Sequence, residues 1–127
     1  MNIEDISKIC HKFPQVTEDI KWENHLCFCV GEKMFIVTAP DASPVSASFK
    51  ADDEDFVALT ERDGIIPAPY MARYKWVHID NISRLNKKEW EVYIQKAYTM
   101  VAEKLPGKLK RSLGIGEAVQ APAKTVK

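Results

Sequence analysis

The sequence predicts an α+β fold in which an antiparallel β-sheet is covered on one face by helices. Apolar residues recur at helical spacing near both ends of the chain, over residues 3–12 and again from residue 87 onward. Between these segments, short runs with a period of two are joined by turn-forming residues, which is the pattern of a local meander. The order is unlike the regular alternation of strands and helices that builds a parallel sheet.

Residues 3–12 are expected to form the first helix. Asn2 is a suitable N-cap, Asp5 follows it by three residues, and Pro14 ends the apolar pattern. The stretch PQVTED that comes next has the composition of a turn.

Three strands of a meander are expected to follow. Two apolar runs within IKWENHLCFCVGEKMFIVTAP flank Gly31-Glu32, a Gly-first pair that suits a type II′ hairpin turn. In VSASFK, apolar residues alternate with Ser46, Ser48 and Lys50, which is typical of a strand with one face in water.

A short second helix and a further strand are predicted next. ADDEDFVALTERDG carries Asp52 or Asp53 as an N-cap and Gly64 as a left-handed stop, and its acidic first turn complements the helix dipole. KWVHI alternates as a strand with Trp76 and His78 on one face, and a Pro-rich segment precedes it.

The longest helix has the clearest boundaries. Asn86 caps it, Glu89 completes a capping box, and Pro106-Gly107 ends it after about 18 residues. We expect Trp76 and Trp90 to share the core beneath this helix. KLKRSLGI can add one basic turn. Together these elements predict a single domain over residues 1–113. The segment 114–127 lacks periodicity and is expected to be a flexible tail.

Composition indicates a soluble protein. The chain has 127 residues, of which 46% are hydrophobic and 28% are charged, as is usual for one globular domain. No apolar run approaches the roughly 18 residues of a membrane helix. The N-terminal MNIEDISKIC is acidic and amphipathic, unlike a secretion signal. We therefore expect a cytoplasmic protein without a membrane partner.

The sequence favours no enzyme class, metal or cofactor. It has no Gly-x-Ser-x-Gly elbow, phosphate loop or dinucleotide fingerprint. His25, Cys27 and Cys29 alternate along one strand, but His25 and Cys29 would lie about 13 Å apart, too far for one zinc ion. Three cysteines, an odd number, are expected to be reduced and buried. The acids near residue 53 are explained as a helix cap and first turn.

Charge is divided unevenly along the chain, although its net value is zero. Residues 1–63 carry thirteen Asp and Glu against six Lys and Arg, whereas residues 64–127 carry five against twelve. If the halves separate in space, the basic half suits a polyanion; if they pack together, they neutralise each other. We expect weak binding to duplex DNA through the basic half, without sequence specificity. The candidate residues are Arg73, Lys75, Arg84, Lys87, Lys88, Lys104, Lys108, Lys110 and Arg111.

The alternative is a binding module without catalysis, for a small ligand or a protein partner. Aromatic side chains would then line a cleft between the sheet and the long helix. The candidates are Tyr70, Tyr74, Trp76 and Tyr98. Exposed rings beside cations would favour nucleic acid, whereas rings around a concavity would favour a ligand.

The order of these elements resembles the MmcQ/YjbR family of small bacterial proteins, over residues 1–113. The resemblance implies a double-wing α+β fold with likeness to frataxin and a DNA-binding role. Arg73 stands where many members have lysine, and Ala97 stands where many have serine, so a role of that hydroxyl is absent here. The matching positions are Lys33, Met34, Phe35, Tyr70, Trp76, Tyr98, Lys104, Leu105 and Pro106.

Overall fold

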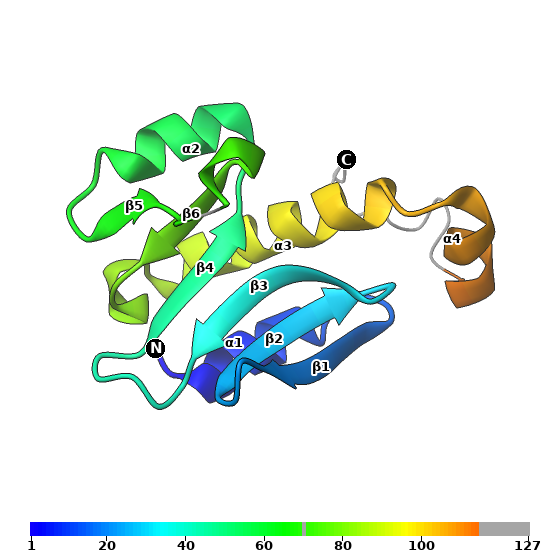
Figure 1. The fold of residues 1–127 in the computed structure, drawn as a ribbon, viewed down its shortest axis with the longest axis horizontal. Helices are drawn as coiled ribbons and strands as arrows, with labels where there is room; N and C mark the ends of the chain where they lie inside the picture. The colour runs from blue at the N-terminus through cyan, green and yellow to red at the C-terminus, as the bar shows by residue number, and fades with distance from the viewer. Residues whose placement is uncertain (70, 115–127) are drawn as a thin grey trace.

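The computed structural model describes residues 1–69 and 71–114, and within them the chain forms six strands and four α-helices (Figure 1). The strands are β1 Val16–Lys21, β2 His25–Val30, β3 Lys33–Ala39, β4 Ser46–Lys50, β5 Ile65–Pro67 and β6 Trp76–Ile79. The helices are α1 Ile3–Cys10, α2 Asp53–Thr60, α3 Lys87–Glu103 and α4 Gly107–Leu113, with the short 3-10 turns η1 Ala72–Tyr74 and η2 Ile82–Arg84.

All six strands belong to one antiparallel sheet in the order β1-β2-β3-β4-β6-β5. Helix α3 packs on β3 and β4, α1 packs beside α3, and α2 packs on β5 and β6. In Figure 1, α1 and α3 lie behind the sheet and the opposite face points toward the viewer. The predicted α+β fold, with helices covering one face of the sheet, is confirmed. We call the two sides the covered face and the open face.

The covered face holds the main hydrophobic core. Trp90 of α3 has no exposed surface, and its indole N–H donates a 2.8 Å hydrogen bond to the carbonyl oxygen of Ile82. Its ring meets Phe49 of β4 edge-on at a centroid distance of 5.5 Å. Because the one polar atom of the indole is paired, the burial of Trp90 leaves no donor without a partner.

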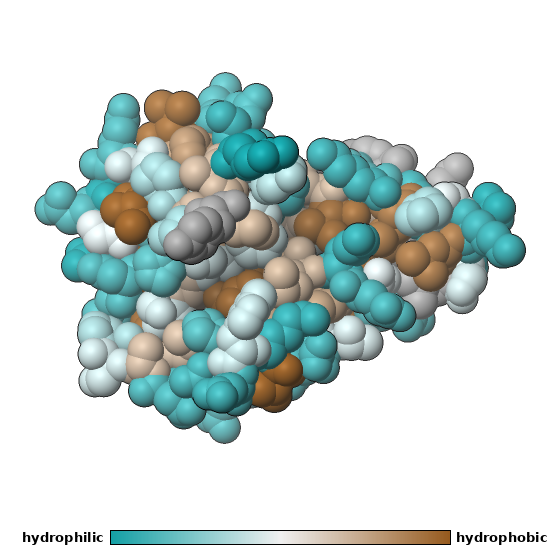
Figure 2. Space-filling view, in the orientation of Figure 1, coloured by the Kyte–Doolittle hydropathy of each residue, from teal (hydrophilic) through white to brown (hydrophobic). Residues whose placement is uncertain are grey.

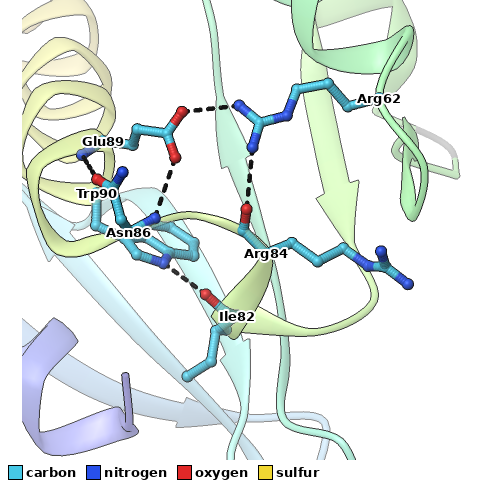
Figure 3. Close-up of polar contacts among 6 residues, drawn as sticks. All are labelled: Arg62, Ile82, Arg84, Asn86, Glu89 and Trp90. Carbon is cyan, nitrogen blue, oxygen red and sulfur yellow. Dashed lines mark hydrogen bonds and ion pairs between the residues drawn. The ribbon is translucent and has the colours of Figure 1, made fainter.

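The predicted helix caps are present at all three positions. Asn2 and Asp5 form a capping box at α1, and the side chain of Asp52 accepts from the backbone of Asp55 at α2. At α3, Asn86 and Glu89 exchange hydrogen bonds of 2.8 and 3.0 Å (Figure 3). Each cap satisfies backbone N–H groups that the first helical turn leaves free.

Arg62, which follows α2, connects the end of that helix to the cap of α3. Its guanidinium donates to the Glu89 carboxylate at 2.8 Å and to the backbone oxygen of Arg84 at 3.0 Å (Figure 3). The contacts hold the end of α2 against the start of α3.

The meander has one strand more than predicted, because residues 16–21 form β1 instead of a turn. β1 pairs with β2 along its whole length, from Val16 opposite Val30 to Lys21 opposite His25. It is an edge strand with mostly exposed side chains, so it lacks the apolar run that identifies an inner strand. Its pairing with β2 outweighs its polar composition.

Two expected glycine roles also differ in the structure. Gly31 and Glu32 both have positive φ, +57° and +67°, the pattern of a type I′ turn rather than type II′. Gly64 is left-handed, with φ of +82°, but α2 has already ended at Thr60. Gly64 instead leads into β5, the short edge strand that the sequence did not reveal.

Trp76 and Trp90 do not share a core, which corrects our expectation. The alternation along β6 is as predicted: Val77 and Ile79 join the core on the covered face, and Trp76 and His78 lie on the open face. Trp76 is nevertheless only 5% exposed. The sheet therefore lies between the two indoles.

Two further expectations concern the ends of the domain and membranes. α4 supplies the basic turn expected after Pro106, while the tail predicted from residue 114 onward lies, apart from Gly114, outside the described residues. Among the described helices, none is long and apolar enough to cross a membrane.

Candidate functional site

The open face carries a continuous row of side chains that crosses all six strands. Residues directly opposite each other in antiparallel strands point to the same face of a sheet. The pairing places Ile66, His78, Ser48, Val37, Cys27 and Asp19 in such a row, from β5 to β1. A second set on this face includes Lys50, directly opposite Trp76.

A hollow of about 540 Å³ lies where β3 begins, β4 ends and the C-terminal end of α3 passes the sheet. We call it the basic groove. Figure 2 shows the open face of the sheet. Hydrophobic residues gather in the middle of this face and toward the α4 end, between hydrophilic side chains. The groove is lined by Lys33, Met34, Lys50, Met71, Tyr74, Trp76, Met100, Val101, Lys104, Leu105 and Pro106.

Three lysines give the groove its positive charge. Lys33 begins β3, Lys104 is the C-cap of α3, and both are exposed. Lys50 is half-buried, and its Nζ donates a 3.0 Å hydrogen bond to the backbone oxygen of Tyr74. Burial, together with the neighbouring charge of Lys104, lowers the pKa of Lys50. Among the described residues that line the groove, none is acidic.

Tyr74 and its neighbours form the aromatic part of the groove. Tyr74 is 51% exposed, and the guanidinium of Arg73 lies 5.0 Å from its ring centroid. Lys75 places its Nζ 5.1 Å from the ring of Phe56. Arg73 and Lys75 thus flank the groove residue Tyr74 in the sequence, and their charges lie over aromatic rings.

The nine predicted cations do not form one patch. Arg84 is paired with Asp80, which lies four residues before it. Lys87 and Lys88 lie at the N-terminal end of α3, and Lys104 lies at the other end, about 25 Å away for 17 helical residues. The groove gathers only Lys104 from the predicted set, and Arg73 and Lys75 flank its residue Tyr74 in the sequence. Lys108, Lys110 and Arg111 continue from that end along α4.

The two charged halves of the sequence are partly neutralised in space. Lys96 belongs to the basic half, and its Nζ lies 2.9 Å from Oδ2 of Asp55 and 3.7 Å from Oδ2 of Asp52, both in the acidic half. Arg62 and Glu89 pair across the same division. The basic groove, rather than a basic half-molecule, is where positive charge remains without acidic lining.

The four predicted cleft aromatics occupy different surroundings. Tyr74 and Trp76 line the groove. Tyr98 instead lies in the core, where its ring stacks on that of Phe13 at a centroid distance of 5.0 Å. Its hydroxyl donates a 2.7 Å hydrogen bond to the Pro14 carbonyl oxygen. Burial raises the pKa of Tyr98 to about 12. Tyr70 lies outside the described residues.

A second hollow, of about 600 Å³, occupies the centre of the open face and is called here the open-face pocket. It shares Met34, Met71 and Trp76 with the basic groove, so the two are contiguous. Its remaining lining residues are Trp22, His25, Val37, Ala39, Ser46, Ala47, Ser48, Ala68, Pro69 and His78.

Ser48 and His78 form the polar centre of this pocket. The Ser48 hydroxyl and His78 Nδ1 lie 2.9 Å apart across β4 and β6. Burial lowers the pKa of His78, which keeps the ring neutral at pH 7. The sequence marks both residues as members of alternating strands, but only the register between β4 and β6 brings them together.

The cysteines are buried as predicted, although two of them are on the open face. Cys27 and Cys29 lie opposite Val37 and Met34 of β3 and are at most 3% exposed. Burial raises the pKa of Cys27 to about 11, so its thiol is protonated at neutral pH. No group of three potential metal ligands occurs in the part of the chain that the structure describes.

Lys33 and Lys50 are groove residues that the charge analysis missed. Both belong to the acidic half of the sequence, residues 1–63. Because the charge was summed over each half, these two lysines were not chosen as candidates. The alternation of Ser46, Ser48 and Lys50 does place Lys50 on the solvent side of its strand. The approach of Lys33 and Lys50 to Lys104 depends on the tertiary fold.

Comparisons with known proteins agree with this architecture. A sequence model of the YjbR family matches residues 11–100. The crystal structure of Deinococcus radiodurans protein DR2400, which has a DUF419 domain, superposes with a TM-score of 0.79 at 21% sequence identity. The match covers 89% of this chain and 88% of that chain. No curated protein matches the sequence.

Several positions that carry the sequence resemblance meet at one place in the fold. Phe35 lies in the core, as Tyr98 does. The positions that line the basic groove are Lys33, Met34, Trp76, Lys104, Leu105 and Pro106.

Proposed function

The chain belongs to the YjbR family, and we propose that it binds single-stranded nucleic acid in the basic groove, weakly and without sequence specificity. The observation that supports this proposal is the meeting of three lysines from three different elements in one groove whose described lining has no acid. The same groove is lined by apolar side chains and by the exposed Tyr74.

The lysines supply attraction for phosphates. Ammonium groups that contact phosphates release condensed counterions, so binding is strong at low salt and weakens as salt rises. The lining of the groove ends at Pro106, directly before α4, where Lys108 and Arg111 are exposed. A strand that follows the groove would meet these cations next.

The aromatic and methionine lining favours a single strand over a duplex. The bases of a single strand expose their faces, and an accessible aromatic ring can stack on them without reading their sequence. Tyr74 is exposed enough to serve in this way, and Met71 and Met100 give an adaptable apolar surface. In a duplex the base faces are already stacked, so only the phosphate contacts would remain.

Fluorescence anisotropy with a labelled oligothymidine and a labelled duplex of equal length tests the proposal. We expect tighter binding of the single strand and a loss of affinity with rising salt. Tyr74→Ala should weaken binding of the single strand more than binding of the duplex. Val92→Ala, which also removes an exposed apolar side chain, serves as the control. Absence of single-strand binding at low salt, or binding indifferent to salt, would overturn the proposal.

A further inference from the structure

We infer that the open-face pocket is a binding site for a planar heterocycle of the nucleobase type, whose edge carries a hydrogen-bond donor beside an acceptor. The ring can belong to a free nucleoside or to a base of a bound strand. In the second case the inference rests on the proposed function, because the pocket opens into the basic groove through Met34, Met71 and Trp76.

The size and walls of the pocket suit such a ring. Its volume of about 600 Å³ is within the range of sites for small organic molecules. Trp76 is buried at its inner wall, and Trp22 stands at its rim with 63% of its surface exposed. Met34 and Met71 offer polarisable thioethers, which make favourable contacts with aromatic rings. A flat ring held against these side chains gains apolar contact area.

Ser48 and His78 supply the polar edge of the site. Because the imidazole is neutral, their 2.9 Å hydrogen bond has two forms. Either Ser48 donates to Nδ1, which leaves Nε2–H as a donor and the hydroxyl oxygen as an acceptor, or Nδ1–H donates to Ser48, which leaves the hydroxyl as a donor and Nε2 as an acceptor. In both forms the pair offers one donor and one acceptor, the complement of a nucleobase edge.

This polar pair is assigned to binding rather than to nucleophilic catalysis. A serine–histidine nucleophile needs a group that orients the ring through its second nitrogen. Among the described residues, none makes a hydrogen bond to Nε2 of His78.

The rim of the pocket near Trp22 carries a buried polar atom that its packing does not satisfy. Trp22 itself lies beside Glu23 in the loop that joins β1 and β2, where both residues have positive φ, +50° and +73°. The rings of Trp22 and His25 meet edge-on at a centroid distance of 5.9 Å. Nδ1 of His25 is buried without a hydrogen-bond partner among the described residues. A buried polar atom without a partner can be satisfied by a ligand that enters the adjoining pocket.

NMR titration of the full chain provides the test, because each of the three tryptophans gives its own indole N–H signal. The probes are adenosine, guanosine, cytidine and uridine, each with its 5′-monophosphate. We expect saturable shifts of Trp22 and Trp76 and none of Trp90, which is buried on the other face. The monophosphates should bind about tenfold more tightly, since the phosphate can reach the groove lysines. No shift up to about 10 mM, or equal shifts of all three signals, would overturn the inference.

Variants separate the polar edge from the fold. Ser48→Ala should weaken nucleoside binding about tenfold, because it removes one half of the donor–acceptor pair. Ser83→Ala, at an exposed serine outside the pocket, should leave binding unchanged. Trp22→Ala alters an exposed side chain that the core does not need, and it should also weaken binding. Unchanged affinity in both Ser48→Ala and Trp22→Ala would contradict the site.

The same titration with oligothymidine distinguishes the two proposals. Nucleoside shifts without strand binding would support the pocket and overturn the proposed function. Strand binding that leaves Trp22 and Trp76 unshifted, together with silent nucleosides, would overturn the pocket and leave the groove. Shifts with both ligands would place a base of the strand in the pocket.

Discussion

The two faces of one sheet differ in what their side chains do. On the covered face, Trp90 is fully buried, its N–H is paired, and its ring packs on Phe49. On the open face, Trp76 is nearly as buried, but it lines two hollows that contain a neutral histidine and three lysines. The same strands build both faces, because successive side chains alternate.

The comparison shows that two tryptophans of nearly equal burial can have different surroundings. Trp76 and Trp90 differ in exposure by only 5%. Their surroundings differ: apolar side chains enclose Trp90, whereas Trp76 borders two hollows whose mainly apolar linings also include lysines, Ser48 and His78. Variants of each face should therefore affect different measurements.

The largest loss of stability is expected for Trp90→Ala. The substitution removes a buried ring and leaves a cavity, so the free energy of unfolding should fall by about 3–5 kcal/mol. Chemical denaturation followed by circular dichroism measures the change. A loss below about 1 kcal/mol would show that the covered face is not the main core.

Trp76→Ala should cost less, about 1–2 kcal/mol, because its site adjoins hollows that water can enter, so the cavity penalty is small. The same denaturation experiment, run on both variants, gives the ratio of their losses in the free energy of unfolding. Equal losses in the two variants would contradict the difference between the faces.

The cap of α3 should contribute a smaller, pH-dependent amount. The hydrogen bond from Arg62, followed by that from the Asn86 backbone, lowers the pKa of Glu89. Stability from this carboxylate is therefore present above its ordinary pKa and is lost as pH falls through the lowered value. Glu89→Gln should cost about 1 kcal/mol at pH 7.

Below the lowered pKa of Glu89, the wild type and Glu89→Gln should converge in stability. Lys87→Gln, at the neighbouring exposed position, is the control and should leave the profile unchanged. A constant difference between Glu89→Gln and the wild type at every pH would mean that the charge of Glu89 is not what stabilises the cap.

Local signals in the sequence account for the parts of the fold that were predicted. The capping box at Asn86, the alternation of KWVHI and the stop at Pro106 each depend on neighbouring residues, so the sequence shows them directly. β1 and β5 were missed because edge strands need no continuous apolar pattern. The type I′ turn was missed because Glu32, a residue uncommon at positive φ, adopts it.

The site was less predictable than the fold because it depends on long-range register. Trp76 and Lys104 were candidates for separate roles, one as an aromatic wall and one as a cation. Lys33 and Lys50 join them only when β3, β4 and α3 are assembled, and Ser48 reaches His78 only through strand pairing. Tyr98 and Trp76 were both predicted to line a cleft because both are aromatic, yet Tyr98 lies in the core.

The most direct test of the open face as the binding face is the salt dependence of single-strand binding in two lysine variants of equal net charge. One variant combines Lys33→Gln, Lys50→Gln and Lys104→Gln in the groove. The control combines substitutions at three exposed lysines elsewhere, Lys8→Gln, Lys87→Gln and Lys88→Gln.

The groove variant should bind more weakly and lower the slope of log affinity against log salt by about 2, as expected for the loss of three phosphate contacts. The control should keep the wild-type slope. Equal slopes in the two variants would show that the open face does not hold the strand.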